Sequence, residues 1–250
     1  MRLGDISAVV SVVIPCLDEA ESIAGVVREV LAQNVDEVVV VDNGSTDATA
    51  ERARAAGARV VCEPQRGYGR ACAAGLRAIR ADADIVCFLD GDGSDVPSFL
   101  ADIVGPVARD EADFVMGSRL TGRRETGSMT PQQIVAGRLA GLLLRLVYGA
   151  RLSDMSPFRA MRVERLRRLS MREPTYGWNL EMQMRAAAAG LRLREIAVDH
   201  RRRRGGVSKV SGNLVAGLKA AWAIATTFVR LTAALRDRAG QTCGPRRVEP

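Results

Sequence analysis

The chain has 250 residues, of which 47% are hydrophobic and 4% aromatic, and its formal net charge is +7. This composition is sufficient for one sizeable hydrophobic core, and the positive charge favours an anionic partner such as a phosphate or an acidic membrane surface. The few aromatic residues argue against a nucleic-acid-stacking surface, and the single histidine, His200, argues against a His-rich metal site or a Ser-His-Asp triad.

The cysteines form no C-x-x-C pair and therefore suggest no disulfide framework. They are Cys16, Cys62, Cys72, Cys87 and Cys243. The first residues also lack the basic segment and long apolar run of an export signal. The reducing cytoplasm is therefore the expected compartment.

The first part of the chain alternates between short apolar runs and segments with helical periodicity. Strands are expected at residues 8–14, 37–41, 58–62 and 85–89, with intervening helices that end near residues 31, 56 and 80. Such β-α-β alternation builds a parallel sheet with helices on both faces. We therefore predict an α/β fold with a mostly parallel central sheet.

The second part of the chain continues this pattern less regularly. Strands are expected at residues 114–119 and 192–198, helices at 134–147, 163–169, 178–189 and 214–235, and a loop at 153–159. We expect a catalytic domain over residues 1–212, an apolar or amphipathic helix over 213–238 and a disordered tail over 239–250.

The helix beginning near residue 214 has two possible roles. Its most apolar run, residues 220–229, is shorter than the ~20 residues that span a bilayer. Lys219 and Arg230 bracket this run, while Trp222 and Phe228 suit a membrane interface. Packing against the protein core and peripheral membrane contact both remain possible, and no transmembrane span is predicted.

The most informative stretch, Asp90-Gly91-Asp92, follows the strand expected at residues 85–89. Open α/β sheets bind ligands beyond the carboxyl ends of their strands. In an extended segment, Asp90 and Asp92 point the same way and could share one divalent cation. Gly91 leaves room for a phosphate to approach the backbone. A plain acidic turn is the alternative, because D-G pairs also mark turns.

Acidic residues also follow the first two predicted strands. Asp18 and Glu19 follow the first strand, and Asp42 and Asp47 follow the second. Because parallel strands end at one edge of the sheet, these acids are expected near the Asp90–Asp92 stretch. Helix N-capping by Asp18, Thr46 or Asp47 explains each loop singly but not why all of them share one edge.

Seven short motifs then complete a recognisable order. They are residues 13–19 (VIPCLDE), 41–49 (VDNGSTDAT), 66–71 (RGYGRA), 90–92 (DGD), 117–119 (GSR), 154–159 (DMSPFR) and 206–209 (GVSK). Their combination resembles the family 2 glycosyltransferases of the GT-A fold, in the branch that includes dolichyl- and polyprenyl-phosphate sugar synthases. A combination of this kind is far more specific than any one motif.

The resemblance implies transfer of a sugar from a nucleotide diphosphate sugar, with inversion and with Mg²⁺ or Mn²⁺. Asp90 and Asp92 would hold the metal ion, which neutralises charge on the departing diphosphate. The residues implied in donor binding are Pro15, Leu17, Glu19, Asp42, Gly67, Asp90 and Gly91. Those implied in binding a phosphate or the acceptor are Arg119, Asp154, Arg159, Arg203, Ser208 and Lys209. The catalytic candidates are Asp92, Arg119 and Glu181.

The role expected of Glu181 depends on the acceptor. A hydroxyl acceptor needs a base, and Glu181 is the candidate. A phosphate acceptor is already ionised, so Glu181 would instead orient groups or pair with an arginine. An exposed glutamate on a helix surface is the third alternative. Of the nearby basic residues, Arg201, Arg202 and Arg204 are interpreted as a solvated surface.

The leading acceptor is a polyprenyl phosphate at the inner face of a membrane, and a small hydroxyl or phosphorylated compound is the runner-up. Ser94 departs from the branch, which commonly has glutamine there. The lack of multiple transmembrane helices after the catalytic domain is a second departure. A nucleotidyltransferase is disfavoured because no Lys-bearing Gly-rich loop follows the first strand. A non-catalytic protein that binds a nucleotide sugar or an anionic lipid remains an alternative, and nucleic acid is not an expected partner.

Overall fold

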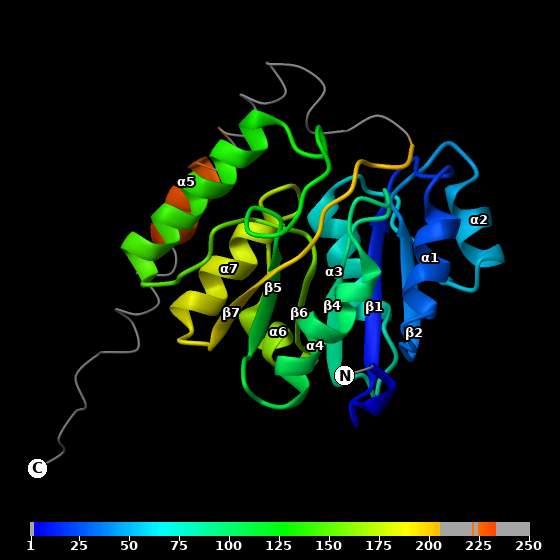
Figure 1. Ribbon diagram of the computed structural model, residues 1–250, viewed down its shortest axis with the longest axis horizontal. Coiled ribbons are helices and arrows are strands. Elements are labelled where there is room, and N and C mark those ends of the chain that lie inside the picture. The colour runs from blue at the N-terminus through cyan, green and yellow to red at the C-terminus, as the bar shows by residue number, and fades with distance from the viewer. Residues whose placement is uncertain (1–2, 206–221, 223–224, 234–250) are drawn as a thin grey trace, which may run out of the picture.

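The computed structural model describes residues 3–205, 222 and 225–233. Within them, one sheet of seven strands runs through the molecule in the order β3-β2-β1-β4-β6-β5-β7 (Figure 1). The strands are β1 (Val10–Cys16), β2 (Glu37–Asp42), β3 (Arg59–Cys62), β4 (Ile85–Phe88), β5 (Phe114–Ser118), β6 (Arg159–Arg162) and β7 (Leu193–Ala197).

The sheet is mostly parallel, as the alternation predicts. The pairs β1–β2, β2–β3, β1–β4 and β5–β7 are parallel, whereas β6 is antiparallel to both β4 and β5. The expected loop at 153–159 is therefore wrong at its end, because Arg159 begins a strand. Only Ala160 and Met161 separate the arginines of this strand, so its sequence carries no strand periodicity.

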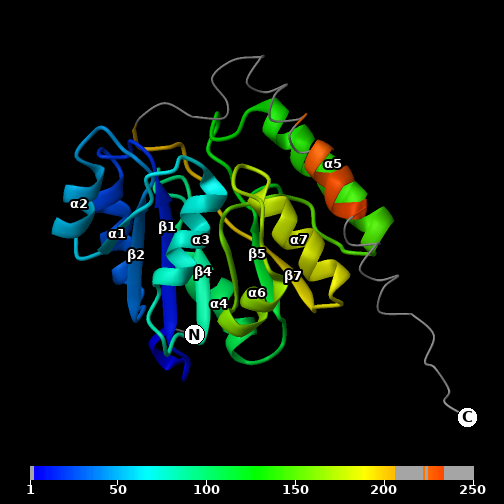
Figure 2. The same ribbon diagram turned by 180° about the vertical axis from the view of Figure 1, so that it is seen from behind.

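Helices cover both faces of the sheet, which Figures 1 and 2 show from opposite sides. They are α1 (Ile23–Leu31), α2 (Thr49–Ala55), α3 (Tyr68–Ala78), α4 (Leu100–Ala108), α5 (Pro131–Tyr148), α6 (Val163–Leu169) and α7 (Trp178–Ala188). Two short 3₁₀ helices, η1 (Leu3–Asp5) and η2 (Pro97–Phe99), complete the described elements. Helix α4 is not predicted from the sequence, because it contains Gly105 and Pro106, two residues that disfavour a helix interior.

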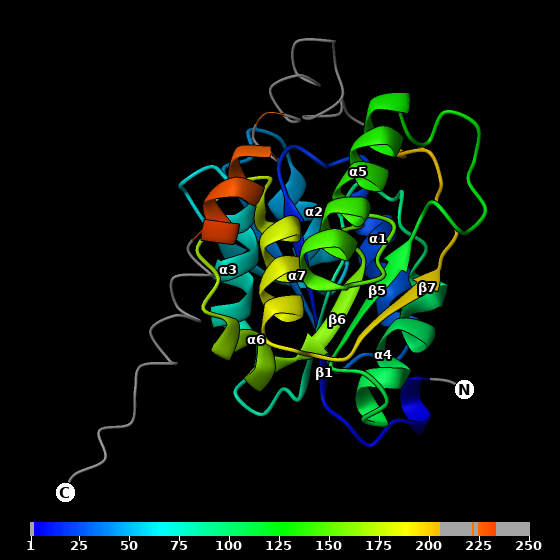
Figure 3. The same ribbon diagram turned by 90° about the vertical axis from the view of Figure 1, so that its left-hand side faces the viewer.

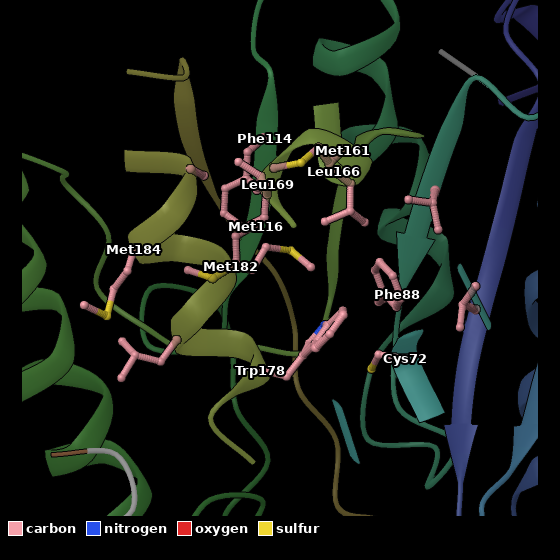
Figure 4. Packing of buried hydrophobic residues seen from close by; sticks show 14 of the residues in the cluster. Cys72, Phe88, Phe114, Met116, Met161, Leu166, Leu169, Trp178, Met182 and Met184 are labelled. Carbon is pink, nitrogen blue, oxygen red and sulfur yellow. The ribbon is translucent and has the colours of Figure 1, made fainter. Parts of the chain in front are cut away.

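The central strands alternate between two hydrophobic clusters, because successive side chains of a strand point to opposite faces. On one face, Val13 belongs to a cluster with Phe88 and Trp178, which Figure 4 shows between α7 and the sheet. On the other face, Val12 and Ile14 pack with residues of α1 and α4. Burial on both faces explains why these strands read as continuous apolar runs.

Outside these layers, α5 packs on α7 at the side of the molecule away from β3. Residues 222 and 225–233 are helical, and the ring of Phe228 lies edge-on to Tyr148 of α5 at 6.5 Å. The proposed boundary at 212 and the tail at 239–250 lie outside the described residues. In the described ranges, no helix has the length and apolar character needed to cross a membrane.

Candidate active site

A cleft of about 900 Å³ opens at the carboxyl ends of β1, β4 and β5. This volume lies within the usual range of small-molecule sites, ~300–1,000 Å³. The predicted site residues that line it are Pro15, Leu17, Glu19, Gly67, Asp90, Gly91, Asp92, Arg119 and Arg203. Asn43 of the motif at 41–49 also lines the cleft, so the chain brings together residues from five of the seven motifs and from the segment after β7.

The remaining predicted residues do not line this cleft in the described part of the chain. Asp42 accepts a hydrogen bond from the backbone N–H of Ser45 at 3.0 Å and so shapes the loop after β2. Asp154, Arg159 and Glu181 lie behind the cleft wall, in contacts described below. Ser208 and Lys209 lie outside the described residues.

The acidic loop after β4 is held by its own hydrogen bonds. Asp92 Oδ1 accepts from the backbone N–H of Ser94 at 2.9 Å and from its hydroxyl at 2.6 Å. Asp95 Oδ2 accepts from the backbone N–H of Asp90 at 3.0 Å. The Tyr68 hydroxyl donates to Asp90 Oδ1 at 3.2 Å. Ser94 therefore fixes the orientation of the Asp92 carboxylate.

Gly91 is required by packing as well as by its place in the cleft. A Cβ atom at this position would lie 2.4 Å from Cys16 Sγ, at the end of β1. The Gly91 carbonyl also accepts a hydrogen bond from the Ser22 hydroxyl at 2.8 Å. Ser22 stands at the N-cap of α1 without a side-chain cap bond. The acidic loop is thus seated directly against β1 and the start of α1.

The acids of this loop carry more negative charge than the surrounding protein compensates. Burial and the nearby charges of Asp95 and Asp92 raise the pKa of Asp90. Burial, together with repulsion from Asp92, also raises the pKa of Asp95 to about 6, although its bond from the Asp90 N–H acts in the opposite direction. A divalent cation would relieve this repulsion, and oxygen ligands suit Mg²⁺ and Mn²⁺.

His200 lines the cleft, a position that is not predicted from the sequence. Its Nδ1 lies 3.9 Å from Asp95 Oδ1, and both atoms are buried without a hydrogen-bond partner among the described residues. Burial and the charge of Arg119 lower the pKa of His200 to about 4, which keeps the imidazole neutral near pH 7. A neutral imidazole can accept a hydrogen bond or ligate a metal.

The side chains of the cleft suit a divalent ion whose coordination is completed by phosphate oxygens of a bound substrate. The described parts of the chain contain no arrangement of three or more His, Cys, Asp or Glu side chains able to hold a metal by themselves. Mg²⁺ is usually bound through one or two carboxylates plus substrate phosphates. Asp90 and Asp92, with the neutral His200 beside them, therefore suit an ion that arrives with phosphate oxygens.

Arg119 projects into the cleft from the end of β5 and is held from behind by Asp154. Arg119 Nε and Nη2 donate to the two Asp154 oxygens at 2.8 and 2.9 Å, a bidentate pair. The Asp154 side chain is fully buried. Burial alone would raise the pKa of Asp154, but the charge and hydrogen bonds of Arg119 outweigh it and lower that pKa. Asp154 therefore positions Arg119 and does not face the cleft.

Arg159 is buried below the cleft, although the family resemblance implies that it binds a phosphate or the acceptor. Its guanidinium donates to the backbone carbonyls of Pro157, Ser156 and Asn179 at 3.0, 2.5 and 3.4 Å. Only 1% of its surface is exposed. The side chain ties the loop before β6 to α7, and its positive charge is felt at Asp90 only through space.

Glu181 is also buried, so the interpretation as an exposed glutamate is wrong. Its carboxylate accepts from the backbone N–H groups of Arg172 and Glu173 at 2.9 and 2.6 Å and from Arg185 Nε at 2.7 Å. These bonds anchor the segment that continues to Thr175 and Tyr176, which line the cleft. The geometry matches the predicted pairing with an arginine and does not support a base in the cleft.

The segment after β7 crosses the cleft mouth and is clamped by ion pairs. Arg203 pairs with Glu19, and its Nη1 lies 3.6 Å from Asp92 Oδ2. Arg201 and Arg204 both pair with Glu29 of α1, at 3.0 and 2.6 Å. Arg204 is exposed, as the interpretation as a surface residue expected, and Arg201 is partly buried, but both side chains have this fixed partner. They hold the segment that carries His200 and Arg203 against α1.

Other cleft residues gained no role from sequence reasoning, although they lie in the motifs. The Asn43 amide donates to the carbonyls of Glu63 and Gln65 at 2.9 and 2.8 Å, and its oxygen accepts from the Gly67 N–H at 2.7 Å. Asn43 thereby holds the loop that carries Tyr68 into the cleft. The one sequence signal that could have identified Asn43 and Tyr68 is their position inside the motifs at 41–49 and 66–71.

Comparisons with known proteins agree with this geometry. The Glycosyl transferase family 2 model matches residues 11–170. An uncharacterized glycosyltransferase of Mycobacterium tuberculosis is 40% identical over 210 residues, covering 82% of this chain and 91% of that protein. An undecaprenyl-phosphate mannosyltransferase of Micrococcus luteus is 31% identical over 218 residues, covering 81% of this chain and 88% of that protein.

Solved structures extend the comparison to the fold. Glucosyl-3-phosphoglycerate synthase from Mycobacterium tuberculosis, in complex with Mn²⁺, UDP-glucose and phosphoglyceric acid, has a TM-score of 0.69 and 25% identity, covering 91% of this chain and 80% of that one. A complex of the same enzyme with Mg²⁺ and UDP has a TM-score of 0.71, 25% identity and the same coverage.

The sheet order, the antiparallel strand β6 and these neighbours define a glycosyltransferase of the GT-A fold, which confirms the predicted fold class. The chain belongs to glycosyl transferase family 2. The resemblance drawn from the seven motifs is thereby confirmed at the level of the family.

Proposed function

We propose that this enzyme transfers a sugar from a nucleotide diphosphate sugar to a polyprenyl phosphate at the inner face of a membrane. The observation that carries the proposal is that Asp90, Asp92, Arg119 and Arg203 line the same cleft. Acids that suit a metal-bound diphosphate and arginines that suit phosphates thus share one space. A simple acidic turn would not require this convergence.

Donor binding is assigned to the side of the cleft formed by β1 and the loop before α3. Pro15, Leu17 and Gly67 provide its apolar and backbone surface, and Glu19 stands beside them. Asp42, which shapes the neighbouring loop, is assigned a supporting part in the nucleoside pocket. A large apolar wall with a few polar groups is the usual form of such a site.

Asp90 and Asp92 are assigned to hold Mg²⁺ or Mn²⁺, with His200 as a further donor. When bound, such an ion neutralises the charge that builds on the departing diphosphate. The structural neighbours crystallised with Mn²⁺ or Mg²⁺ and UDP ligands support this assignment. Ser94 and Tyr68 keep the two carboxylates oriented in advance through the hydrogen bonds described above.

The transfer is one displacement with inversion at the anomeric carbon. A phosphate oxygen of the acceptor forms the new bond to this carbon while its bond to the diphosphate oxygen breaks, and the bonding pair leaves with the diphosphate. Arg119, oriented by Asp154, and Arg203 stabilise the two phosphate groups. An ionised phosphate carries no proton to remove, which agrees with Glu181 lying outside the cleft.

A lipid acceptor is supported by the undecaprenyl-phosphate mannosyltransferase of Micrococcus luteus, which aligns with 81% of this chain. The second candidate acceptor is a small phosphorylated compound. It is favoured by the structural neighbours, which hold phosphoglyceric acid. Both acceptors present an anionic phosphate to the same arginines, so the difference between them lies in the rest of the acceptor molecule.

The test combines donor binding with acceptor turnover. Thermal unfolding is followed with UDP-, GDP- and dTDP-sugars, each with and without Mn²⁺. We expect one nucleotide to stabilise the wild type only with metal, and not to stabilise Asp92→Ala. Product formation is then measured with undecaprenyl phosphate and with 3-phosphoglycerate. Turnover with phosphoglycerate alone would select the second candidate, and metal-independent binding without any turnover would refute an enzymatic role.

A further inference from the structure

Helix α5 exposes large apolar side chains and buries mainly small residues, which is the reverse of an ordinary surface helix. Val135, Leu139, Leu142 and Leu146 are 65%, 54%, 53% and 72% exposed, respectively. They occupy positions i, i+4, i+7 and i+11, which lie on one face of a helix. The buried face is formed instead by smaller residues and one leucine, namely Gly137, Ala140, Gly141 and Leu144.

This orientation is fixed by close packing. A Cβ atom at Gly141 would lie 2.3 Å from the Leu152 carbonyl oxygen, and one at Gly137 would lie 3.3 Å from Asp154 Oδ1. The two glycines therefore let α5 approach the loop that carries Asp154. The helix cannot rotate to bury its leucines without bringing larger side chains into this contact.

A second helix on the same side of the molecule carries further exposed apolar residues. Trp222 and Val229 are 73% and 69% exposed. Residues 225–233 are joined to α5 by the contact of Phe228 with Tyr148. Figure 3, which turns this side of the molecule to the viewer, shows α5 and the helix of residues 225–233 on the same side. Exposed apolar patches that combine several large side chains mark interaction sites.

The charges around this face select its partner. The sequence of α5 contains no Asp or Glu, and Arg138 and Arg145 stand exposed along one flank of the apolar stripe. Two copies of this face packed with antiparallel helices would bring arginines toward arginines. An anionic lipid surface instead offers phosphate groups to the arginines and acyl chains to the leucines. An exposed Trp222 also suits a membrane interface.

The position of α5 relative to the cleft supports the same partner. Thr130 and Gln133, at the amino-terminal end of the helix, line the cleft. The stripe begins two residues later and runs for roughly 16 Å at 1.5 Å per residue. A lipid phosphate in the bilayer would therefore reach the cleft from the surface on which α5 lies.

We propose that the face formed by Val135, Leu139, Leu142 and Leu146, flanked by Arg138 and Arg145, docks this enzyme on an anionic bilayer, with α5 in the plane of the interface. The inference deepens the proposed function, since it identifies the surface that would present the cleft to a lipid phosphate. It also makes a separate statement, because vesicle binding does not require catalysis.

The test measures binding of the full chain to vesicles by flotation. We expect the wild type to bind phosphatidylcholine vesicles that contain phosphatidylglycerol, and high salt to weaken this binding. Leu139→Gln/Leu146→Gln should reduce binding roughly tenfold or more, because two leucines lose their burial in the acyl region. Arg138→Gln/Arg145→Gln should reduce it by a similar factor on anionic vesicles, at ~1 kcal/mol per arginine.

The matched control is Arg28→Gln/Arg54→Gln, which removes two exposed arginines from α1 and α2 on the opposite side of the molecule. It should bind vesicles like the wild type. Equal loss in this control would show attraction by net charge alone and overturn the proposal. Sedimentation velocity gives the other outcome: a dimer that the leucine variant dissociates, without vesicle binding, would assign the face to a second copy.

Metal-dependent stabilisation by the nucleotide sugar separates this inference from the proposed function. Both double variants should retain it, since neither changes a residue that lines the cleft. Intact donor binding without vesicle binding would overturn the docking surface and leave donor transfer standing. Vesicle binding by a protein that binds no nucleotide sugar would support the docking surface and overturn the proposed sugar transfer.

Discussion

The acids at the floor of the cleft and the acids behind its wall have opposite electrostatic environments. Asp90, Asp92 and Asp95 repel one another, and the pKa values of Asp90 and Asp95 are raised. Asp154 and Glu181 are buried more completely than Asp90 and Asp92, but each is paired with an arginine and held by backbone N–H groups. Incompletely compensated charge indicates a ligand that arrives later, and compensated charge indicates a part of the scaffold.

The largest expected effect is that of Asp92→Asn. Removing one carboxylate from the candidate metal site should lower kcat/KM roughly a thousandfold, because electrostatic stabilisation of the leaving group amounts to several kcal/mol. The midpoint temperature of thermal unfolding should be unchanged or slightly raised, since repulsion within the loop decreases. Asp102→Asn, an exposed substitution on α4, is the control. If Asp92→Asn kept its activity within a few fold of the wild type, the acids at the cleft floor would not differ in function from those behind the wall.

Glu181→Gln should have the opposite profile. Breaking this buried pair leaves the Arg185 charge uncompensated and should lower the free energy of unfolding by ~3 kcal/mol, measured with urea. Glu164→Gln breaks the exposed pair with Arg168, also at i and i+4, and should cost ~0.5 kcal/mol or less. If Glu181→Gln lost turnover while keeping full stability, Glu181 would be the catalytic base after all.

Asp154→Asn should affect both stability and the acceptor. Loss of charge in the bidentate pair should lower the free energy of unfolding by ~2 kcal/mol and raise the acceptor KM, because Arg119 is no longer held. The folded-state pKa of Asp154 is lowered, so its stabilising contribution is complete above the unfolded pKa of ~3.9 and is lost as pH falls through the lowered value.

Urea denaturation below about pH 4 should therefore show a smaller acid-induced loss in Asp154→Asn than in the wild type. The exposed variant Asp102→Asn should lose stability on acidification as the wild type does. An identical acid profile for Asp154→Asn would show that the buried pair contributes no net stability.

Tyr68→Phe should have the smallest effect. It removes one hydrogen bond to Asp90, with a net value of ~1 kcal/mol, so the metal concentration for half-maximal activity should rise roughly fivefold. A metal titration at saturating donor measures this shift. An unchanged metal requirement would mean that Asp90 is oriented without the tyrosine.

The sequence predicts the cleft floor better than the wall behind it. The spacing of Asp90 and Asp92 after an apolar strand is a local signal, and the structure puts both in the cleft. Whether Asp154 or Glu181 faces the cleft depends on Arg119 and Arg185, and pairing over 35 residues, as for Asp154, leaves no local pattern. His200 is likewise brought to Asp95 only by the fold.

The predicted parallel core follows from apolar runs in β1, β2 and β4, which are buried on both faces. The strand β6 was missed because its two buried apolar residues gain their stability from neighbours distant in sequence. Arg159 illustrates the same limit. A polar residue in a motif suggests a ligand, yet this one is occupied by three backbone carbonyls.

The placement of β6 also constrains how the chain can be made. Every strand pairing between the β1–β4 side of the sheet and the β5–β7 side passes through β6, which ends at Arg162 of a 250-residue chain. During synthesis, β4 and β5 remain unpaired at these edges until about two thirds of the chain has been made. Nascent chains of this enzyme are therefore expected to be most prone to aggregation just before residue 162 leaves the ribosome.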